Sequence, residues 1–259
     1  MPPLALAGNL CQDVVENGPP RIGGGPYYCA QAWRALGVRA TIFTRCGPAE
    51  RTALARRLIS VGLPVVMLDG TATTSFSFYY VDAATRVMTV EHAGDAWSAA
   101  DARRVTPGAW VHVAPLLRSD FSADTLAVLA RGRRVSFDGQ GLVRAPALGP
   151  LQLDADFDRT MLRHVHILKL AEEEAEVIGA VDRLGVPEVL VTYGPNGSRL
   201  HYGGRWERVG AWPVASDPTG SGDAFSAAYL AGRARGLAPA SAARRATALV
   251  GAMLMRRLG

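Results

Sequence analysis

Strand-like apolar segments alternate with helix-like segments along most of this 259-residue chain. The strand-like segments are short apolar runs, and the segment at 49–61 between two of them carries arginines on the outer face of a predicted helix. Because repeated strand–helix–strand units form parallel sheets, this order predicts a mostly parallel sheet with helices on both faces. In such folds, ligands bind beyond the carboxyl ends of the strands.

The expected strands and helices follow one another at short intervals. The helix at 26–36 opens with a proline and closes before Gly37, as is typical of helix ends. Further helices are expected at 49–61, between 116 and 130, from Glu172 onward, and as a pair at the carboxyl end. Strands are expected at 4–10, 40–46, 65–69, 110–116, 134–139, 164–170, 188–194, 198–203 and 205–212.

The stretch from 74 to 93 has a different pattern. "TSFSFYYVD" at 74–82 alternates small polar and aromatic residues, and "RVMTVEHA" at 86–93 follows after a short turn. A period of two predicts a half-exposed hairpin, an antiparallel excursion that covers one end of the sheet. Its aromatic residues make it a candidate dimer surface.

The length suits one large α/β domain with a small appendage. No apolar run reaches about 18 residues, so no membrane span is expected, and residues 1–10 resemble a strand more than a signal peptide. Cys11, Cys29 and Cys46 are an odd number at no metal-ligand spacing. A disulfide framework is not expected, and a reducing, cytoplasmic setting fits best.

The net charge is +5, and almost all of the positive charge is arginine because Lys169 is the only lysine. The arginine pairs are scattered, without interleaved aromatic residues, which favours solvated helix faces over a nucleic-acid surface. We therefore expect no nucleic-acid partner. A moderately positive surface also suits a small anionic ligand such as a nucleotide.

The stretch "DPTGSGDAF" at 217–225 permits two interpretations. It has the composition of a capped helix start, with a proline, turn glycines and an acid in the first turn. The same residues suit an anion site: Gly220 and Gly222 leave the backbone N–H groups bare at a helix N-terminus. Asp223 would then lie beside the anion as a base for an alcohol that attacks a phosphoryl group.

This stretch closely resembles the carboxyl-terminal signature of the ribokinase-like (phosphofructokinase B type) carbohydrate kinases, usually D-T-x-G-A-G-D-x-F. The resemblance covers nearly the whole chain, with "GNLCQDVV", "GGGPYYCAQAWRALG" and "VTYGPNG" in the family's order. It implies a three-layer α/β/α fold with a mostly parallel central sheet and a small β-hairpin lid. Residues 1–259 would form a single kinase domain, with the lid contributed mainly by about 74–93.

The resemblance also implies roles for individual residues on the acceptor side. Asp223 would be the catalytic base, and Gly220, Ser221 and Gly222 would form the anion hole. The substrate would be bound by Asp13 and by the glycine pair Gly24 and Gly25.

On the donor side, the family uses ATP with Mg²⁺. The nucleotide segment would contribute Thr192, Gly194 and Gly197, and we also assign Lys169 and Thr219 to the nucleotide side. Asp217 would order the loop beside a monovalent cation such as K⁺. Glu174 matches the acid of the family's N-x-x-E motif, which organises the Mg²⁺ region largely through water.

The chain departs from the family at two positions. Ala171 stands where the N-x-x-E asparagine is usual, and Cys29 stands where a sugar-contacting asparagine is common. A thiol is a weak hydrogen-bond partner, so Cys29 argues against a ribose-type grip. These features resemble the inositol-kinase-like branch, in which Asp138, Gln140 and Arg144 would line the substrate or phosphate side. Asp138 equally suits a strand-end turn, and Arg144 a surface position.

The sequence therefore predicts an ATP- and Mg²⁺-dependent phosphotransferase that acts on a hydroxyl group of a polyol or sugar, with myo-inositol as one candidate. Two alternatives stay open. In a nucleoside kinase, Tyr27 and Tyr28 would stack on a base. In a catalytically silent binding protein, the fold would persist without turnover, for which Ala171 and Cys29 leave room.

Overall fold

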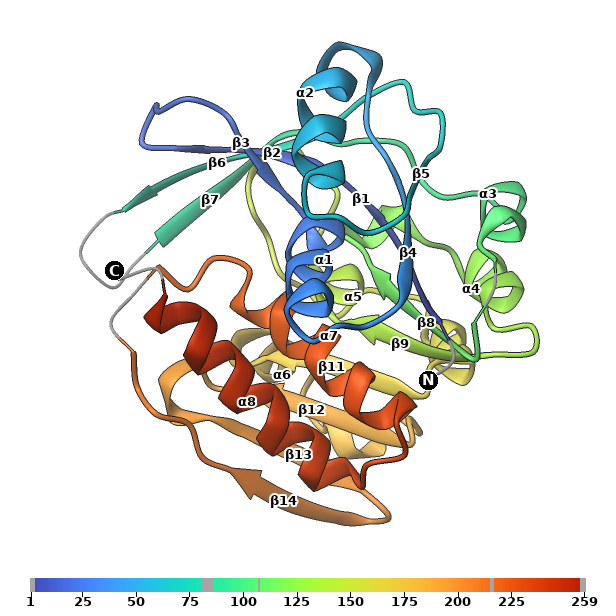
Figure 1. Cartoon of the computed structure of the whole chain (residues 1–259), viewed down its shortest axis with the longest axis vertical. Coiled ribbons are helices and arrows are strands. Elements are labelled where there is room, and N and C mark those ends of the chain that lie inside the picture. The colour runs from blue at the N-terminus through green and yellow to red at the C-terminus, as the bar shows by residue number, and fades with distance from the viewer. Residues whose placement is uncertain (1–2, 81–85, 107, 215–216, 257–259) are drawn as a thin grey trace.

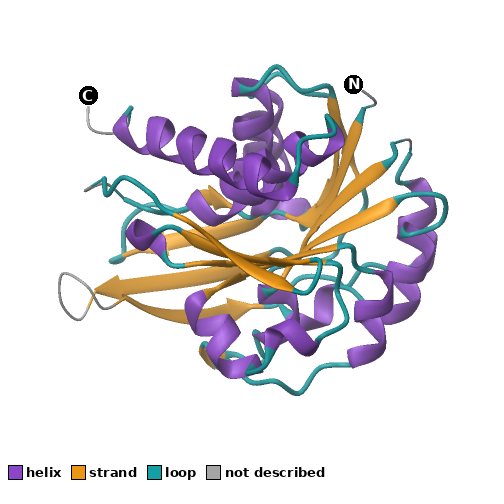
Figure 2. Cartoon of the chain, turned by 90° about the horizontal axis from the view of Figure 1, so that it is seen from below, coloured by secondary structure: helices purple, strands orange, loops and turns teal. Residues whose placement is uncertain are grey.

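A large sheet runs through the centre of the molecule, with helices on both of its faces (Figure 1, Figure 2). This computed structural model describes residues 3–80, 86–106, 108–214 and 217–256. Figure 2 shows the three layers from the side, with the sheet between two groups of helices. The predicted three-layer arrangement is therefore confirmed.

Within the described residues, nine strands form the large sheet. Strands β12, β11, β9, β8, β1, β4 and β5 lie side by side in this order, and each pair of neighbours is parallel. Strands β13 and β14 are added antiparallel beside β12. The spatial order is β14 (Arg205–Val209), β13 (Ser198–Tyr202), β12 (Glu188–Thr192), β11 (Ile167–Ala171), β9 (Arg134–Asp138), β8 (Trp110–Ala114), β1 (Leu4–Asn9), β4 (Ala40–Arg45) and β5 (Val65–Met67).

Both faces of the large sheet are buried, which explains why its strands are continuous apolar runs. In β1, Leu4 and Leu6 belong to one core, and Ala5 and Ala7 to the other, because successive side chains point to opposite faces. The first core packs under α1 (Gly25–Ala35), α2 (Pro48–Ile59), α7 (Ser221–Ala234) and α8 (Pro239–Met255). The second packs under α3 (Ala99–Arg104), α4 (Ala123–Leu129), α5 (Gln140–Val143) and α6 (Glu172–Ile178).

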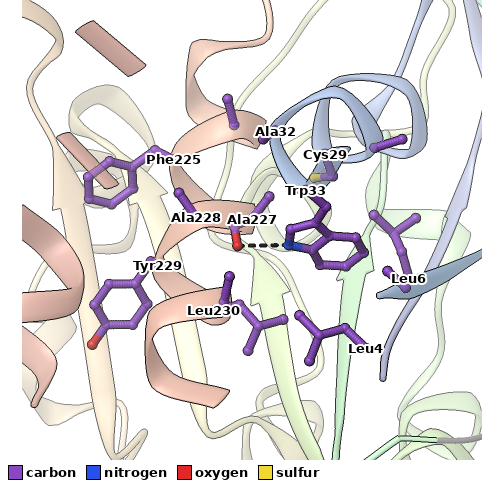
Figure 3. Close-up of a cluster of buried hydrophobic side chains, with 14 of the residues drawn as sticks. Leu4, Leu6, Cys29, Ala32, Trp33, Phe225, Ala227, Ala228, Tyr229 and Leu230 are labelled. Carbon is purple, nitrogen blue, oxygen red and sulfur yellow. Dashed lines mark hydrogen bonds between the residues drawn. The ribbon is translucent and has the colours of Figure 1, made fainter. Parts of the chain in front are cut away.

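Helices α1 and α7 pack against each other over the first core (Figure 3). Small residues of α7, including Ala227 and Ala228, let the two helices approach closely, and Trp33 of α1 fills the space beside them. The indole Nε1 of Trp33 donates a hydrogen bond of 2.8 Å to the carbonyl oxygen of Ala227. This buried contact fixes the position of α7 relative to α1, and both helices begin at the candidate site described below.

A second, smaller sheet extends from one end of the large one (Figure 1). We call it the small sheet. The inner sides of its strands contribute Cys11, Phe76, Phe78 and Val90 to a third apolar cluster, which also contains Leu116. Its strand order is β10 (Gly149–Pro150), β7 (Arg86–His92), β6 (Thr74–Tyr80), β2 (Cys11–Val15) and β3 (Arg21–Gly23).

The expected strands and helices are present, several of them shorter than predicted. The antiparallel pairing of β6 with β7 confirms the hairpin, and the turn predicted between them lies outside the described residues. Strands β2, β3 and β10 were not predicted, because a strand of two to five residues carries little periodic signal. Their pairing with β6 and β7 is a tertiary effect.

All three cysteines are free thiols and are buried. Among the described residues, no helix is both long and apolar enough to cross a membrane.

Candidate active site

A cavity of about 320 Å³ lies at the carboxyl ends of β9, β11 and β12, between the large sheet, the small sheet and the start of α7. We call it the main cavity. Of the predicted site residues, the structure brings fifteen to its wall: Asp13, Gly24, Gly25, Asp138, Gln140, Arg144, Lys169, Glu174, Thr192, Gly194, Thr219, Gly220, Ser221, Gly222 and Asp223. The wall does not include Cys29, Gly197 or Asp217 among the residues that the structure describes.

The loop before α7 is ordered by Asp217. Its Oδ1 accepts hydrogen bonds from the backbone N–H of Thr219, at 2.9 Å, and from the hydroxyl of Thr219, at 2.6 Å. Gly220 follows in the left-handed region with φ of 76°, and no side chain caps the helix. The first turn of a helix leaves backbone N–H groups without intrahelical partners, so this start offers donors to an anion in the main cavity.

The ring of Tyr28 packs against Gly220. A Cβ at Gly220 would lie 2.2 Å from Cδ1 of Tyr28, so no larger residue fits there. Tyr28 lines the main cavity, whereas Tyr27 packs against the apolar core under α1 and meets Tyr28 edge-on. Of the two rings, that of Tyr28 is thus at the cavity wall, and stacking of the pair on a nucleobase stays a prediction.

Asp223 lies in the first turn of α7 and faces the main cavity. The pKa of its carboxyl group is raised to about 7, chiefly by burial and also by the negative charges of Asp138 and Asp13, while the positive charges of Lys169 and Arg144 limit the rise. A carboxylate with a pKa near neutrality can accept and release a proton at physiological pH. This is the property that a general base needs.

Lys169 and Asp138 form a buried ion pair beside the first turn of α7. Nζ of Lys169 lies 3.3 Å from Oδ1 of Asp138, and the hydroxyl of Ser226 donates to Oδ2 of Asp138 at 3.4 Å. A Cβ at Gly222 would lie 2.9 Å from the same Nζ, so the ammonium group sits directly against the first turn of α7. Burial alone would lower the pKa of Lys169, but Asp138, Glu174 and Asp223 raise it overall, so the side chain stays positively charged.

Glu174 is buried in the first turn of α6. Its Oε2 accepts a hydrogen bond of 2.8 Å from the backbone N–H of Ala171, which closes half of a capping box. Ala171 has no side-chain oxygen to complete the other half. Burial raises the pKa of Glu174, and the positive charge of Lys169 opposes the rise.

Asp13 enters the main cavity from β2 of the small sheet. Its Oδ1 accepts a hydrogen bond of 3.2 Å from the thiol of Cys11. A Cβ at Gly23 would lie 2.2 Å from Oδ2 of Asp13, so a third glycine, ahead of the predicted pair Gly24 and Gly25, makes room for this carboxylate.

Gln140 and Arg144, at the two ends of α5, also line the main cavity. The amide nitrogen of Gln140 donates to the carbonyl oxygen of Pro115 at 2.5 Å, which fixes the orientation of that side chain. Arg144 ends α5 and also lines a neighbouring cavity of about 330 Å³ beside β7. It contributes positive charge on the side of Glu174.

Cys29 is located differently from the prediction. Its side chain is fully buried in α1 (Figure 3). Its thiol donates to the backbone carbonyl oxygen of Asp223 at 3.3 Å. Because the thiol contacts the backbone of Asp223 and lies away from the cavity wall, it helps to hold the first turn of α7 and has no direct path to a ligand.

Sequence reasoning missed the apolar part of the wall. Phe76, Phe78 and Met88 from the small sheet, with Cys11 and Leu116, complete the main cavity. The period-two alternation in "TSFSFYY" could have indicated this apolar wall, because it puts Phe76 and Phe78 on the same face of the strand. Only the packing of the small sheet reveals that this face covers a cavity.

A second cavity, of about 260 Å³, adjoins the main one across the start of α7. We call it the adjoining cavity. Two residues of the predicted anion hole belong to the wall that the cavities share. The shared residues are Thr192, Gly194, Pro218, Ser221 and Gly222. The rest of the adjoining cavity is mostly apolar and is lined by Pro195, Gly197, Ala211, Trp212, Val214, Phe225, Thr247, Val250, Gly251 and Leu254.

The donor groups at the site fit a magnesium ion that is carried by phosphates. Within the described residues, no three His, Cys, Asp or Glu side chains are grouped as metal ligands. Mg²⁺ usually keeps several waters and takes only one or two carboxylates plus substrate phosphates, so a single buried acid such as Glu174 is compatible with it.

Residues 16–258 match the sequence profile of the pfkB family of carbohydrate kinases. Inositol 3-kinase of Zea mays is 38% identical over 120 residues, which are 46% of this chain and 30% of the maize protein. Inositol 3-kinase of Oryza sativa subsp. japonica is 33% identical over 195 residues, 68% of this chain and 48% of the rice protein. The matched regions thus span less than half of either plant protein.

Solved structures of the ribokinase family share the fold. A pyrophosphate-dependent kinase complexed with a pyrophosphate analog and myo-inositol aligns with a TM-score of 0.85 at 24% identity, over 97% of this chain and 95% of that one. Burkholderia thailandensis nucleoside kinase with inosine gives 0.78 at 19% identity, over 97% and 90%. Arabidopsis thaliana ribokinase with ribose and ATP gives 0.73 at 18% identity, over 98% and 93%.

The profile match spans nearly the whole chain, and the fold, the order of the motifs and the residues gathered at the main cavity agree with it. This chain belongs to the pfkB family of carbohydrate kinases and has the ribokinase-like fold.

Proposed function

We propose that this chain is a kinase that transfers the γ-phosphoryl group of ATP to a hydroxyl group of an inositol-like polyol or a sugar. The observation that carries this proposal is the position of Asp223 at the junction of two cavities. Its carboxylate faces the main cavity, and its neighbours Ser221 and Gly222 line both cavities. An acceptor in one cavity and a donor in the other would meet at the first turn of α7.

Asp223 acts as the general base in this proposal. It accepts the proton of the acceptor hydroxyl while that oxygen attacks the γ-phosphorus and the bond to the leaving nucleoside diphosphate breaks. The backbone N–H groups at the start of α7 and the ammonium group of Lys169 stabilise negative charge on the transferred group. The pKa of Asp223, raised to about 7 mainly by burial, suits a base that must be regenerated after each turnover.

The wall of the main cavity supports a compact polyol as acceptor. The carboxylates of Asp13 and Asp223 accept hydrogen bonds from hydroxyl groups, while Phe76 and Phe78 offer apolar cover for the carbon–hydrogen face of a ring. The names of the plant relatives and the myo-inositol in a structural neighbour favour an inositol.

The adjoining cavity supports a nucleotide as donor. Pyrophosphate, which the structural neighbour with a TM-score of 0.85 uses, has no apolar part that would fill such a cavity. A nucleoside does, because its base is flat and largely apolar and lies a short distance from the phosphates. The adjoining cavity therefore favours ATP over pyrophosphate.

A bound magnesium ion would supply positive charge to the donor phosphates. Glu174 would hold it through water, and Asp217 would keep the loop at 217–220 in position beside the phosphates. A monovalent cation near that loop stays a prediction.

A matrix of donors and acceptors tests the proposal. ATP, pyrophosphate and buffer are each combined with myo-inositol, ribose, inosine and no acceptor, and phosphorylated products are identified by mass spectrometry. Phosphorylated myo-inositol or sugar formed with ATP supports the proposal. Turnover with pyrophosphate but not with ATP contradicts the assignment of ATP as the donor. A preference for inosine as the acceptor favours the nucleoside kinase. ATP binding without any phosphorylated product favours a silent binding protein.

The small sheet is also a proposed dimer surface. Its outer side carries Tyr79, whose side chain is about half exposed, beside the hydrogen-bonded pair Ser77 and Glu91. Light scattering at micromolar concentration tests this, because a monomer under those conditions would contradict it.

A further inference from the structure

The far end of the adjoining cavity contains almost no side-chain group that could distinguish one nucleobase from another. Among the described residues of its wall, no charged, amide or imidazole side chain is present. The hydroxyl of Thr192 is already used, since it donates to the carbonyl oxygen of Leu170 at 3.2 Å. Ser221 lies at the end shared with the anion hole.

Thr247 is the remaining hydroxyl of that wall within the described part of the chain. A hydroxyl is both a donor and an acceptor, so it can pair with the amino group of adenine or the carbonyl group of guanine at similar cost. It therefore provides no discrimination between these bases.

Trp212 is the most unusual residue of the adjoining cavity. Its side chain is 90% exposed although it borders an apolar cavity. A single exposed apolar side chain is common on a protein surface, but Trp212 is the most exposed large hydrophobic residue of the described part of the chain and borders an apolar cavity, which points to a ligand. An indole at a cavity mouth offers a flat face for stacking, and stacking is indifferent to base identity because every base has a π-face.

We propose that Trp212 stacks on the nucleobase of the donor and that the adjoining cavity accepts nucleoside triphosphates with little regard to the base. This inference rests on the proposed function and specifies its donor class. Sites that hydrogen-bond a base edge reject a wrong partner by about 10⁴-fold or more, whereas apolar pockets discriminate by roughly 10- to 200-fold. The wall of the adjoining cavity is apolar, so we expect the weaker discrimination between bases.

The first test compares donors with the intact protein. Initial rates with ATP, GTP, ITP and CTP are measured with the acceptor that gives the highest turnover. We expect the kcat/KM of GTP and ITP to lie within about 100-fold of that of ATP. A larger deficit for GTP overturns base tolerance but leaves a nucleotide-dependent kinase in place. Turnover with pyrophosphate and with none of the four nucleotides would instead contradict the proposed function itself.

The second test removes the indole. Trp212→Ala is compared with Trp206→Ala, a tryptophan of β14 that packs on His201 and lies outside the cavity wall. We expect Trp212→Ala to raise the KM of both ATP and GTP by about fivefold to 100-fold, which corresponds to the loss of one stacked base. Inorganic tripolyphosphate, a competitor without a base, should keep its inhibition constant.

Trp212→Phe should restore most of the affinity, because a phenyl ring still stacks. A rise in KM of less than fivefold relative to the inhibition constant of tripolyphosphate would overturn the role of Trp212. So would an equal effect of Trp206→Ala. Since Trp212 is exposed, a thermal melt should show an unchanged fold.

Discussion

The carboxylate of Asp223 lies against Gly25, a position that Ala114 on its other side restricts to glycine. A Cβ at Gly25 would lie 3.1 Å from Oδ1 of Asp223 and 2.4 Å from Cβ of Ala114. The start of α1, the end of β8 and the start of α7 therefore meet at one point. Of the predicted glycine pair, Gly25 is the one that borders the carboxylate of the proposed base.

Gly25→Ala should displace Asp223 and lower turnover. We expect a loss of about 10-fold to 100-fold in kcat, since a shift of about 1 Å in a catalytic group has effects of that size. Overpacking should also destabilise the fold by roughly 1–3 kcal/mol. Gly210→Ala is the control, because a Cβ there would meet open space. Equal kinetics of the two variants would contradict the close contact.

Asp223→Asn should remove the general base without removing the donor site. We expect turnover to fall by about 10²-fold or more, while the affinity for ATP measured by calorimetry stays nearly unchanged. Asp124→Asn, which changes an exposed first-turn acid of α4, serves as the matched control. Near-normal turnover of Asp223→Asn would refute the assignment of the base.

Asp223 should also make the protein less stable at neutral pH than its Asn variant. The folded-state pKa of Asp223 is raised from 3.8 to about 7, mainly by burial, so its contribution to stability is full below pH 3.8 and is lost as the pH rises to 7. The difference in unfolding temperature between Asp223→Asn and the unmodified chain should therefore grow from pH 5 to pH 8. Thermal unfolding at both values measures it, and a constant difference would contradict the raised pKa.

Ala171→Asn should stabilise the protein. Residue 171 is the N-cap of α6 in extended conformation with no side-chain hydrogen bond, and asparagine is a favoured N-cap. We expect a gain of about 0.5–2 kcal/mol in the free energy of unfolding, measured by urea denaturation. Ala171→Leu, which cannot cap, should show no such gain. Equal stability of both variants would mean that the cap site is not accessible to a side chain.

Lys169→Met should destabilise the fold and abolish most activity, because it leaves Asp138 buried without its partner. Breaking a buried pair costs roughly 3–5 kcal/mol. Lys169→Met with Asp138→Asn should recover part of that stability without recovering turnover, and this coupling is read from a double-mutant cycle.

The control for this cycle is Arg51→Met, which removes the exposed pair with Asp69 and should change stability little. Additive effects of Lys169→Met and Asp138→Asn would show that the two side chains do not depend on each other.

The elements that sequence reasoning found are those with a local signal. The strand of "LALAGN" and the helix start at "SGDAF" are encoded by apolar runs, by glycines and by a first-turn acid. Strand β2 was missed because it pairs in parallel with β6, so that Asp13 opposes Phe76 from a distant part of the chain. No local pattern encodes that register.

The ion pair between Lys169 and Asp138 also depends on the pairing of strands that are distant in the sequence. The two residues are register partners in the neighbouring strands β11 and β9, so their proximity depends on strand order. The sequence alone places Lys169 on the nucleotide side and Asp138 on the substrate side. It does not predict the ion pair between them.

The sequence by itself determined the fold class and the chemistry at the start of α7. Capping, glycine conformation and an acid in the first turn are properties of a few consecutive residues, so they can be read without a structure. Tertiary structure alone decided what surrounds Asp223. The charges of Asp13 and Asp138 that raise its pKa, and the apolar cavity that Trp212 borders, arise from strand register and helix packing across the whole chain. Those long-range contacts turn a helix start with capping residues into the site that we propose for phosphoryl transfer.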